Sequence, residues 1–167
     1  INTMLDIIER DFGDVYILNS EKNKISNIIR EKIGVVFDGN NFPEDLTPQK
    51  LNNVLKAIYT NWEEKKFSEF IEKFNLPKNK KIKNFSRGMK MKLSISVALS
   101  HKAELLILDE ATSGLDPIVR DDILDILLDF VQDEKNSILI SSHITSDLEK
   151  VADYIVFIHK GKVIFEE

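Results

Sequence analysis

Cysteine is absent from the 167-residue sequence, which excludes disulfides, a thiol nucleophile and thiolate metal sites. Histidine is scarce: the three copies, at positions 101, 143 and 159, lack the spacing of a metal-binding set. No apolar run approaches the roughly 20 residues that a membrane-spanning helix requires. Acidic residues also interrupt the first segment, so no signal peptide is recognised. The sequence therefore gives no sign of a thiol-based site, a membrane span or a leader.

An excess of positive charge is missing as well. Lys and Arg total 23 against 28 Asp and Glu, so the formal charge is −5 and the sequence pI is about 5.3. Proteins that bind nucleic acids usually present a basic surface, so nucleic acid is excluded as the main partner. The length suits one domain with a core of its own. With 43% hydrophobic residues, we expect a cytoplasmic α/β domain.

Short apolar runs alternate with amphipathic segments, a pattern that predicts an α/β fold with a layered parallel sheet. The run 105–108 is apolar at every position, as expected for a central strand covered on both faces. A helix over 146–151 has the capping-box spacing of Ser146 and Glu149. The other expected strands are 15–18, 33–37, 137–141 and a hairpin of 154–158 with 162–165, and the other helices are 1–10, 62–74, 88–100, 117–131 and one from about 47 with an apolar face of Leu51, Val54, Leu55 and Ile58.

Charged side chains follow two of the expected parallel strands. The strand 105–108 leads into Asp109 and Glu110, and the strand 137–141 leads, through one further serine, into His143. Ligands bind at the carboxyl ends of strands in such sheets, and paired carboxylates there are costly unless a cation or proton chemistry uses them. Asp109 would suit a water-mediated Mg²⁺ ligand in a nucleoside triphosphatase, and Glu110 would suit polarising an attacking water. Surface carboxylates and a structural histidine remain open alternatives on this pattern alone.

Four motifs in a fixed order favour a functional role of these residues over a purely structural one. They are Phe85-Ser86-Arg87-Gly88-Met89-Lys90, Asp109-Glu110, Ser113-Gly114-Leu115-Asp116-Pro117 and His143. In this order the chain resembles, over essentially its whole length, the ATP-binding-cassette (ABC) ATPases, the nucleotide-binding subunits of ABC transporters. The four motifs match the signature, the Walker B strand with its glutamate, the D-loop and the switch histidine of that family.

The resemblance implies a fold and a division of the chain. The fold is a P-loop NTPase-like layered parallel sheet with an inserted all-helical subdomain. Residues 1–46 would form part of the ATPase core, residues 47–100 the helical signature subdomain, and residues 101–167 the remaining core with Walker B, the D-loop and the switch histidine.

The resemblance also implies a role for each matched residue. Asp109 would bind Mg²⁺, Glu110 would be the general base and His143 would sense the γ-phosphate of ATP. Ser86 and Gly88 would touch the γ-phosphate of ATP held by the opposite subunit. The chemistry agrees, because serine is a good N-cap, glycine allows close backbone approach and the start of a helix favours anions.

The D-loop would run along the dimer interface, with Ser113 and Asp116 as candidate nucleotide contacts. Asp116 followed by Pro117 also predicts an N-cap and a first helical residue.

Two departures from the family pattern concern the nucleotide site. Arg87 replaces a glycine of the signature, and Met89 replaces its usual glutamine. Arg87 would either add a phosphate contact or face solvent as a subfamily variant. Asp38, after the strand 33–37, occupies the position of the family's Q-loop glutamine, and a carboxylate there could still reach Mg²⁺.

The third departure is the Walker A loop, Gly-x-x-x-x-Gly-Lys-Ser/Thr, which cradles phosphates. The stretch from Gly34 to Gly39 has the glycine spacing without the lysine, and we interpret it as a false match because a strand runs through it. Residues 1–10 resemble the end of the helix that follows this loop, and they lack an N-cap. We therefore expect a chain cut from something longer, or a cassette that never had the loop.

The leading hypothesis is an ABC ATPase that hydrolyses ATP with Mg²⁺ as a head-to-tail dimer. It would drive an exporter of the drug or peptide-antibiotic type and sit at the inner face of the membrane, where residues around 38–58 and the helical insert contact a permease. The alternative is a non-catalytic cassette that binds partners without turning over ATP. An ABC protein of DNA repair or translation is disfavoured by the acidic charge. Without a Walker A loop, we expect the isolated chain to be inactive.

Overall fold

A three-stranded parallel sheet forms the centre of the computed structural model, which describes residues 1–9, 11–21, 26–39 and 41–166. The strands lie in the order β3 (Ile33–Val36), β4 (Leu105–Asp109) and β5 (Ser137–Ser141). The register pairs Asp109 with Ser141, so β4 and β5 end side by side. The predicted strands at these positions, with β4 in the middle, are confirmed.

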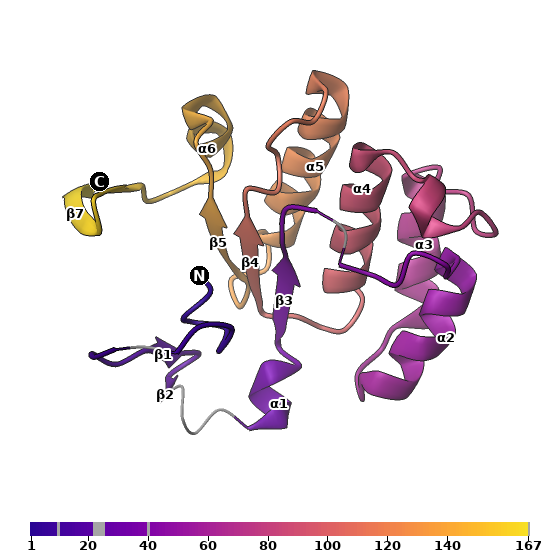
Figure 1. Cartoon of the computed structure of the whole chain (residues 1–167), viewed down its shortest axis with the longest axis horizontal. Helices are drawn as coiled ribbons and strands as arrows, with labels where there is room; N and C mark the ends of the chain where they lie inside the picture. The colour runs from indigo at the N-terminus through magenta and orange to yellow at the C-terminus, as the bar shows by residue number, and fades with distance from the viewer. Residues whose placement is uncertain (10, 22–25, 40, 167) are drawn as a thin grey trace.

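Helices cover the sheet, and Figure 1 shows α2, α3 and α4 gathered beyond β3, with α6 near the end of β5. The helix α4 contacts both β3 and α3, and α5 contacts α6. Within the described ranges, every helix is too short or too polar to cross a membrane. The helices are α1 (Asn27–Arg30), α2 (Pro48–Ile58), α3 (Glu64–Lys73), the 3₁₀ helix η2 (Ile82–Asn84), α4 (Arg87–Ala98), α5 (Pro117–Phe130) and α6 (Thr145–Val151).

Three of these helices begin with a side chain that caps the first turn. The side-chain oxygens of Thr47, Ser86 and Asp116 accept hydrogen bonds from the backbone N–H three residues further on, at 3.3, 3.2 and 3.1 Å. Such a cap stabilises a helix by about 1 kcal/mol. A proline occupies the first helical position of α2 and α5, where its missing N–H leaves no bond unmade. The predicted caps at Ser86 and Asp116 are confirmed.

The strand β4 is buried on both faces at its centre. Leu106, Ile107 and Leu108 are at most 1% exposed, and consecutive strand residues point to opposite faces. The main core joins Leu106 and Leu108 to side chains of α4 and α5. β5 is one of the two edge strands of the sheet among the described residues, and its Leu139 is 38% exposed.

Gly34, the first glycine of the Gly34–Gly39 stretch, lies within strand β3. It lies in β3 opposite Leu106, and a Cβ at this position would come within 2.9 Å of the carbonyl oxygen of Ala98 in α4. A side chain at position 34 would push α4 away from β3. The glycine serves helix–strand packing, which confirms that the phosphate-loop match is false.

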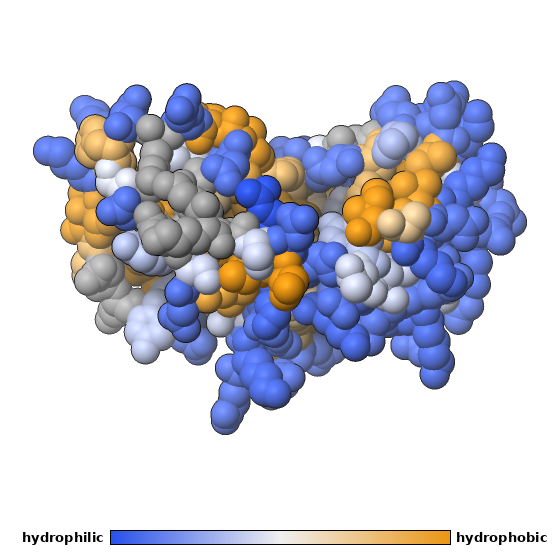
Figure 2. Space-filling view, turned by 90° about the horizontal axis from the view of Figure 1, so that it is seen from below, coloured by the Kyte–Doolittle hydropathy of each residue, from blue (hydrophilic) through white to orange (hydrophobic). Residues whose placement is uncertain are grey.

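Two antiparallel hairpins complete the fold. β6 (Val156–His159) pairs with β7 (Lys162–Glu166) through Lys160 and Gly161, both at positive φ, as predicted. β1 (Tyr16–Ile17), within the expected strand 15–18, pairs with β2 (Ser20–Glu21), a strand that the sequence did not predict. β7 lies apart from the sheet in Figure 1. The β6–β7 hairpin exposes much apolar surface. On the face of the molecule drawn in Figure 2, apolar patches are separated by hydrophilic ones.

Some local predictions are wrong. Residues 1–9 form turns and bends instead of a helix; Asp6 has φ of 61°, a left-handed conformation that ends helical hydrogen bonding, and position 10 lies outside the described residues. The α6 helix starts at Thr145 without a side-chain cap, so Ser146 lies inside the first turn and the capping box does not form. In α2, Leu51 and Leu55 are buried, but Ile58 and, less so, Val54 face solvent.

Candidate functional site

Ser141 holds both acidic residues at the end of β4. Its hydroxyl donates a hydrogen bond to Oδ1 of Asp109 at 2.6 Å. The backbone N–H of Glu110 lies 3.1 Å from the carbonyl oxygen of Ser141 and 3.2 Å from its Oγ, and donates to both. The parallel register that pairs Asp109 with Ser141 makes these contacts possible. The carboxylate of Asp109 and the backbone of Glu110 are therefore anchored to the neighbouring strand.

Glu110 ends β4 with an unusual backbone. Its φ is 52°, a left-handed conformation that destabilises a non-glycine residue by about 1 to 2 kcal/mol. Its N–H is bonded to Ser141, and its carbonyl oxygen accepts from the N–H of Ser113 at 3.0 Å. These bonds offset the strain, and the chain turns directly after the strand.

Glu110 and His143 meet at the surface. Nδ1 of His143 lies 2.6 Å from Oε2 of Glu110, and the two side chains are 66% and 35% exposed. They come from the ends of different strands, as predicted, and both are open to solvent. A carboxylate hydrogen-bonded to an imidazole can accept a proton from a nearby water, which is the chemistry of a general base.

A second group of predicted site residues meets at Arg87. Nη2 of Arg87, the first residue of α4, forms an ion pair with Oδ1 of Asp38 at 2.7 Å, and each side chain is 48% exposed. The guanidinium also covers Gly114, where a Cβ would come within 2.9 Å of its Cζ. Three loops, after β3, before α4 and after β4, therefore converge on this side chain.

Three other signature and D-loop residues, Ser86, Gly88 and Asp116, lie at the starts of helices α4 and α5. Ser86 and Asp116 use their side chains as caps of α4 and α5. A Cβ on Gly88 would lie 3.3 Å from Cγ1 of Val119, so this glycine lets α4 begin close against α5. A role of these residues in nucleotide contact stays a prediction.

Comparison with known proteins identifies the family. The model of the family described as ABC transporter matches residues 1–113. The bacitracin transport ATP-binding protein BcrA of Bacillus licheniformis is 32% identical over 168 residues, covering 99% of this chain and 55% of that protein. The chain belongs to the ABC transporter family.

Further similarities agree with this assignment. The lantibiotic transport ATP-binding protein SrtF of Streptococcus pyogenes is 48% identical over 86 residues, which cover 52% of this chain and 37% of that protein. The ATP-binding cassette MJ0796, solved as a dimer in a post-hydrolysis state with ADP and Pi, matches with a TM-score of 0.84 at 23% identity, over 99% of this chain and 77% of that one. This likeness shows that the fold is that of an ABC cassette. The chain spans about half the length of the curated relatives it matches.

The donor atoms at the end of β4 suit the Mg²⁺ that an ABC ATPase uses with ATP. Mg²⁺ prefers oxygen ligands and takes one or two protein carboxylates, while phosphate oxygens and water complete its shell. Asp109 supplies such a carboxylate. The part of the chain that the structure describes contains no cluster of three or more His, Cys, Asp or Glu side chains able to hold a metal. A nucleotide-assisted site fits these residues better than an all-protein one.

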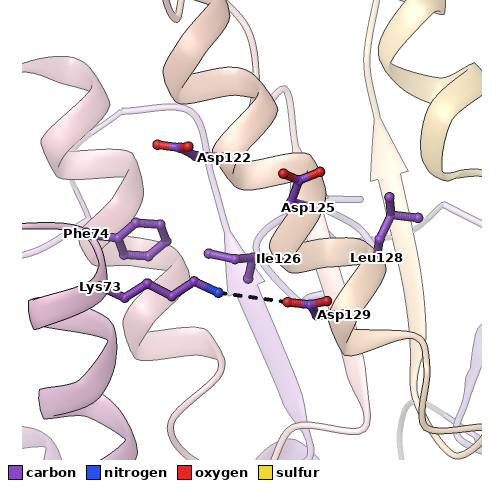
Figure 3. Close-up of a pocket in the computed structure, with 7 residues that line it drawn as sticks. All are labelled: Lys73, Phe74, Asp122, Asp125, Ile126, Leu128 and Asp129. Atoms are coloured by element: carbon purple, nitrogen blue, oxygen red, sulfur yellow. Dashed lines mark ion pairs between the residues drawn. The ribbon is translucent and has the colours of Figure 1, made fainter.

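A cavity among the described residues of this ABC chain is separate from the site. It has a volume of about 470 Å³ and lies against α5, where Lys73 Nζ pairs with Asp129 Oδ2 at 3.8 Å (Figure 3). Phe74 and Ile126 form its apolar part, and Asp122 and Asp125 line it with further carboxylates. None of the predicted site residues lines it.

Sequence reasoning missed Ser141 and the packing of Arg87 on Gly114. The signal for Ser141 was available, because aligning the predicted ends of the two strands places it beside Asp109. The position of Arg87 depends on how α4 packs against the loops after β3 and β4, and no local pattern shows that.

Proposed function

We propose that this chain is part of the ATP-hydrolysing subunit of an ABC exporter for a drug or a peptide antibiotic. The observation that carries the proposal is the contact of Glu110 with His143, beside Asp109, at the carboxyl ends of two parallel strands. Two relatives are named as lantibiotic and bacitracin transport ATP-binding proteins, and these names support the substrate class.

In this proposal, the three residues at the strand ends perform the hydrolysis. Asp109 helps hold Mg²⁺ through water, Glu110 accepts the proton of the attacking water, and His143 orients Glu110 and senses the γ-phosphate. The bound MgATP supplies the phosphoryl group that is transferred. Glu110 and His143 are both exposed enough to be reached by water.

Residues around the start of α4 bind nucleotide across the interface of a head-to-tail dimer. Ser86, Arg87 and Gly88 face the γ-phosphate held by the second copy, with Ser113 and Asp116 beside them and Asp38 near the metal. The Arg87–Asp38 ion pair has a consequence here. Nη2 of Arg87 is bonded to Asp38, so a phosphate that binds at this N–H group would compete with the carboxylate.

The remaining parts of the proposal concern organisation and partners. Residues 1–46 and 101–167 form the ATPase core, and residues 47–100 form the helical subdomain. The region around 38–58 contacts a permease, which holds the subunit at the inner face of the membrane. Support comes from the grouping of α2, α3 and α4 beyond β3 in Figure 1.

A non-catalytic cassette is the second candidate. The observation that favours it is that these 167 residues contain no Gly-x-x-x-x-Gly-Lys-Ser/Thr sequence. The coding sequence immediately upstream of Ile1 separates the two candidates: a strand followed by that loop supports the ATPase, and a start codon supports the non-catalytic cassette.

The functional test compares the protein expressed from its complete gene with the 167-residue chain. We expect the first to hydrolyse ATP and the second neither to hydrolyse it nor to bind MgATP tightly in calorimetry. Glu110→Gln should lower turnover by about 10²- to 10⁴-fold, as is usual for loss of a general base, while nucleotide binding persists. Glu134→Gln, at an exposed turn, is the matched control. Unchanged turnover in Glu110→Gln would remove Glu110 from the mechanism.

A further inference from the structure

Ser141 uses one hydroxyl for two different contacts. A serine hydroxyl can donate one hydrogen bond and accept others. Here it donates to Oδ1 of Asp109 at 2.6 Å and accepts from the N–H of Glu110 at 3.2 Å. One side chain of β5 therefore joins the carboxylate of the proposed metal ligand to the backbone of the proposed base.

We propose that Ser141 is a positioning residue for ATP hydrolysis, a role that rests on the function proposed above. It fixes the Asp109 carboxylate in one orientation and keeps Glu110 in register with His143. It touches neither nucleotide nor metal, and it acts through the two acidic residues.

The Asp109 contact carries the first half of this role. An aspartate carboxylate rotates with little preference about its last torsion. A short bond to a charged acceptor is stronger than an ordinary hydrogen bond, and it holds Oδ1 towards β5. Reaction sites gain rate when their groups are oriented before the substrate arrives. The fixed carboxylate then presents its other oxygen in a constant direction.

The second half concerns the two contacts between β5 and Glu110. Ser141 holds the backbone of Glu110, and His143, two residues further along the chain, holds its side chain at 2.6 Å. The carboxylate of Glu110 therefore keeps its place only while the ends of β4 and β5 stay aligned. The backbone pairing sets that alignment up to its last pair, Asp109 with Ser141, and the Ser141 hydroxyl adds a second bond to Glu110 there.

The contacts also predict that the fold survives without the hydroxyl. In Ser141→Ala, the N–H of Glu110 retains its bond to the carbonyl oxygen of residue 141, at 3.1 Å in this structure. The parallel pairing of β4 and β5 is backbone-mediated and persists. The loss is therefore confined to the orientation of Asp109 and to one of two bonds at Glu110.

The test uses the protein expressed from its complete gene and three variants. Ser141→Ala removes the hydroxyl, Ser141→Thr keeps it, and Ser137→Ala removes an exposed hydroxyl at the opposite end of β5 as the control. The first readout is Mn²⁺ affinity with a non-hydrolysable ATP analogue, measured by electron paramagnetic resonance. The second is the Mg²⁺ concentration that gives half-maximal ATP hydrolysis, and circular dichroism checks that each variant is folded.

We expect Ser141→Ala to weaken Mn²⁺ binding about tenfold and to raise the half-maximal Mg²⁺ concentration about tenfold, the usual weight of a hydrogen bond to a charged group. Affinity for the analogue without metal stays unchanged. Ser141→Thr stays within about twofold of the wild type. The threonine rescue separates a role of the hydroxyl from a purely structural one.

Two results would overturn the assignment while leaving the proposed function intact. One is an active wild type with Ser141→Ala indistinguishable from Ser137→Ala in both readouts. The other is a Ser141→Thr protein that is folded and yet as impaired as Ser141→Ala. A wild-type protein that neither binds Mn²⁺ with the analogue nor hydrolyses ATP would instead overturn the proposed function, and the role of Ser141 with it.

Discussion

The neighbouring strands β3 and β4 both lead into an acidic residue, but the two carboxylates are held by different means. Asp109 is bonded to Ser141 inside the sheet, and the three residues before it are buried. Asp38 is held by the ion pair with Arg87, with both side chains half exposed. A surface ion pair contributes at most about 1 kcal/mol and is screened by salt. The first carboxylate is fixed by the fold, whereas the second can be released.

The largest effect should come from the buried strand that carries Asp109. Leu108→Ala empties a fully buried position and should lower the free energy of unfolding by about 2 to 5 kcal/mol. Ile164→Ala, 65% exposed in β7, should change it by less than about 0.5 kcal/mol. Urea denaturation of both variants gives the two values. Equal losses would show that the buried strand does not set the rigidity of this end.

The ion pair between Arg87 and Asp38 can be disrupted by a substitution at Gly114, in the loop after β4. Gly114→Ala should cost about 1 to 2 kcal/mol because φ is 65°, and the new methyl group should push Arg87 off Asp38. Gly161→Ala, with φ of 74° and no neighbour within 4 Å, has the backbone strain alone. Of the two, only the Gly114→Ala variant should have a stability that depends less on salt than that of the wild type, measured by denaturation at low and high ionic strength. Retained salt dependence would mean that the ion pair survives.

His101 is buried at the opposite end of the sheet, and its burial makes the stability of the fold depend on pH. His101 is 2% exposed, and its Nδ1–H donates to the carbonyl oxygen of Glu31 at 2.8 Å. Burial lowers the pKa of His101, although the hydrogen bond and the Glu31 carboxylate oppose this; nearby Lys66 adds to it. The folded chain therefore binds fewer protons than the unfolded one, and stability should fall as pH drops below about 6.5.

Melting temperatures between pH 5 and 8 test this expectation. His101→Gln should flatten the loss of stability towards low pH, whereas His159→Gln, on the exposed β6 strand, should leave it unchanged. If His101→Gln melts with the same pH dependence as the wild type, burial of His101 is not its source.

The smallest effect should come from Asp38 itself. Asp38→Asn should lower the free energy of unfolding by no more than about 1 kcal/mol, and the loss should vanish in high salt. Asp121→Asn, which breaks an exposed pair with Lys150 of 2.8 Å, is the matched control and should behave alike. A salt-independent loss above about 2 kcal/mol for Asp38→Asn would mean that both carboxylates are held equally firmly.

The two carboxylates also differ in how far the sequence predicted their surroundings. Asp109, Glu110 and His143 each follow a continuous apolar run, so the strands and the meeting of their ends could be expected from local pattern. Asp38 and Arg87 are 49 positions apart, and their contact depends on the packing of α4. The failed helix over residues 1–9 has a similar cause, because apolar periodicity did not reveal the left-handed backbone of Asp6.

Because Gly34 has no side chain, α4 packs directly on β3 at this point, and the contact can act as a pivot for the helix. The carboxyl end of α4, at Ala98, rests directly on β3, and its amino end, at Arg87, lies 11 residues away, about 17 Å at 1.5 Å per residue. A tilt of α4 by about 10° around this pivot would move its amino end by about 3 Å. An ion pair of 2.7 Å is lost once its N–O distance passes about 4 Å, so a displacement of about 3 Å away from Asp38 is sufficient. A small rotation of the whole helix, with no local unfolding, is thus enough to open the contact between the signature residues and the loop after β3.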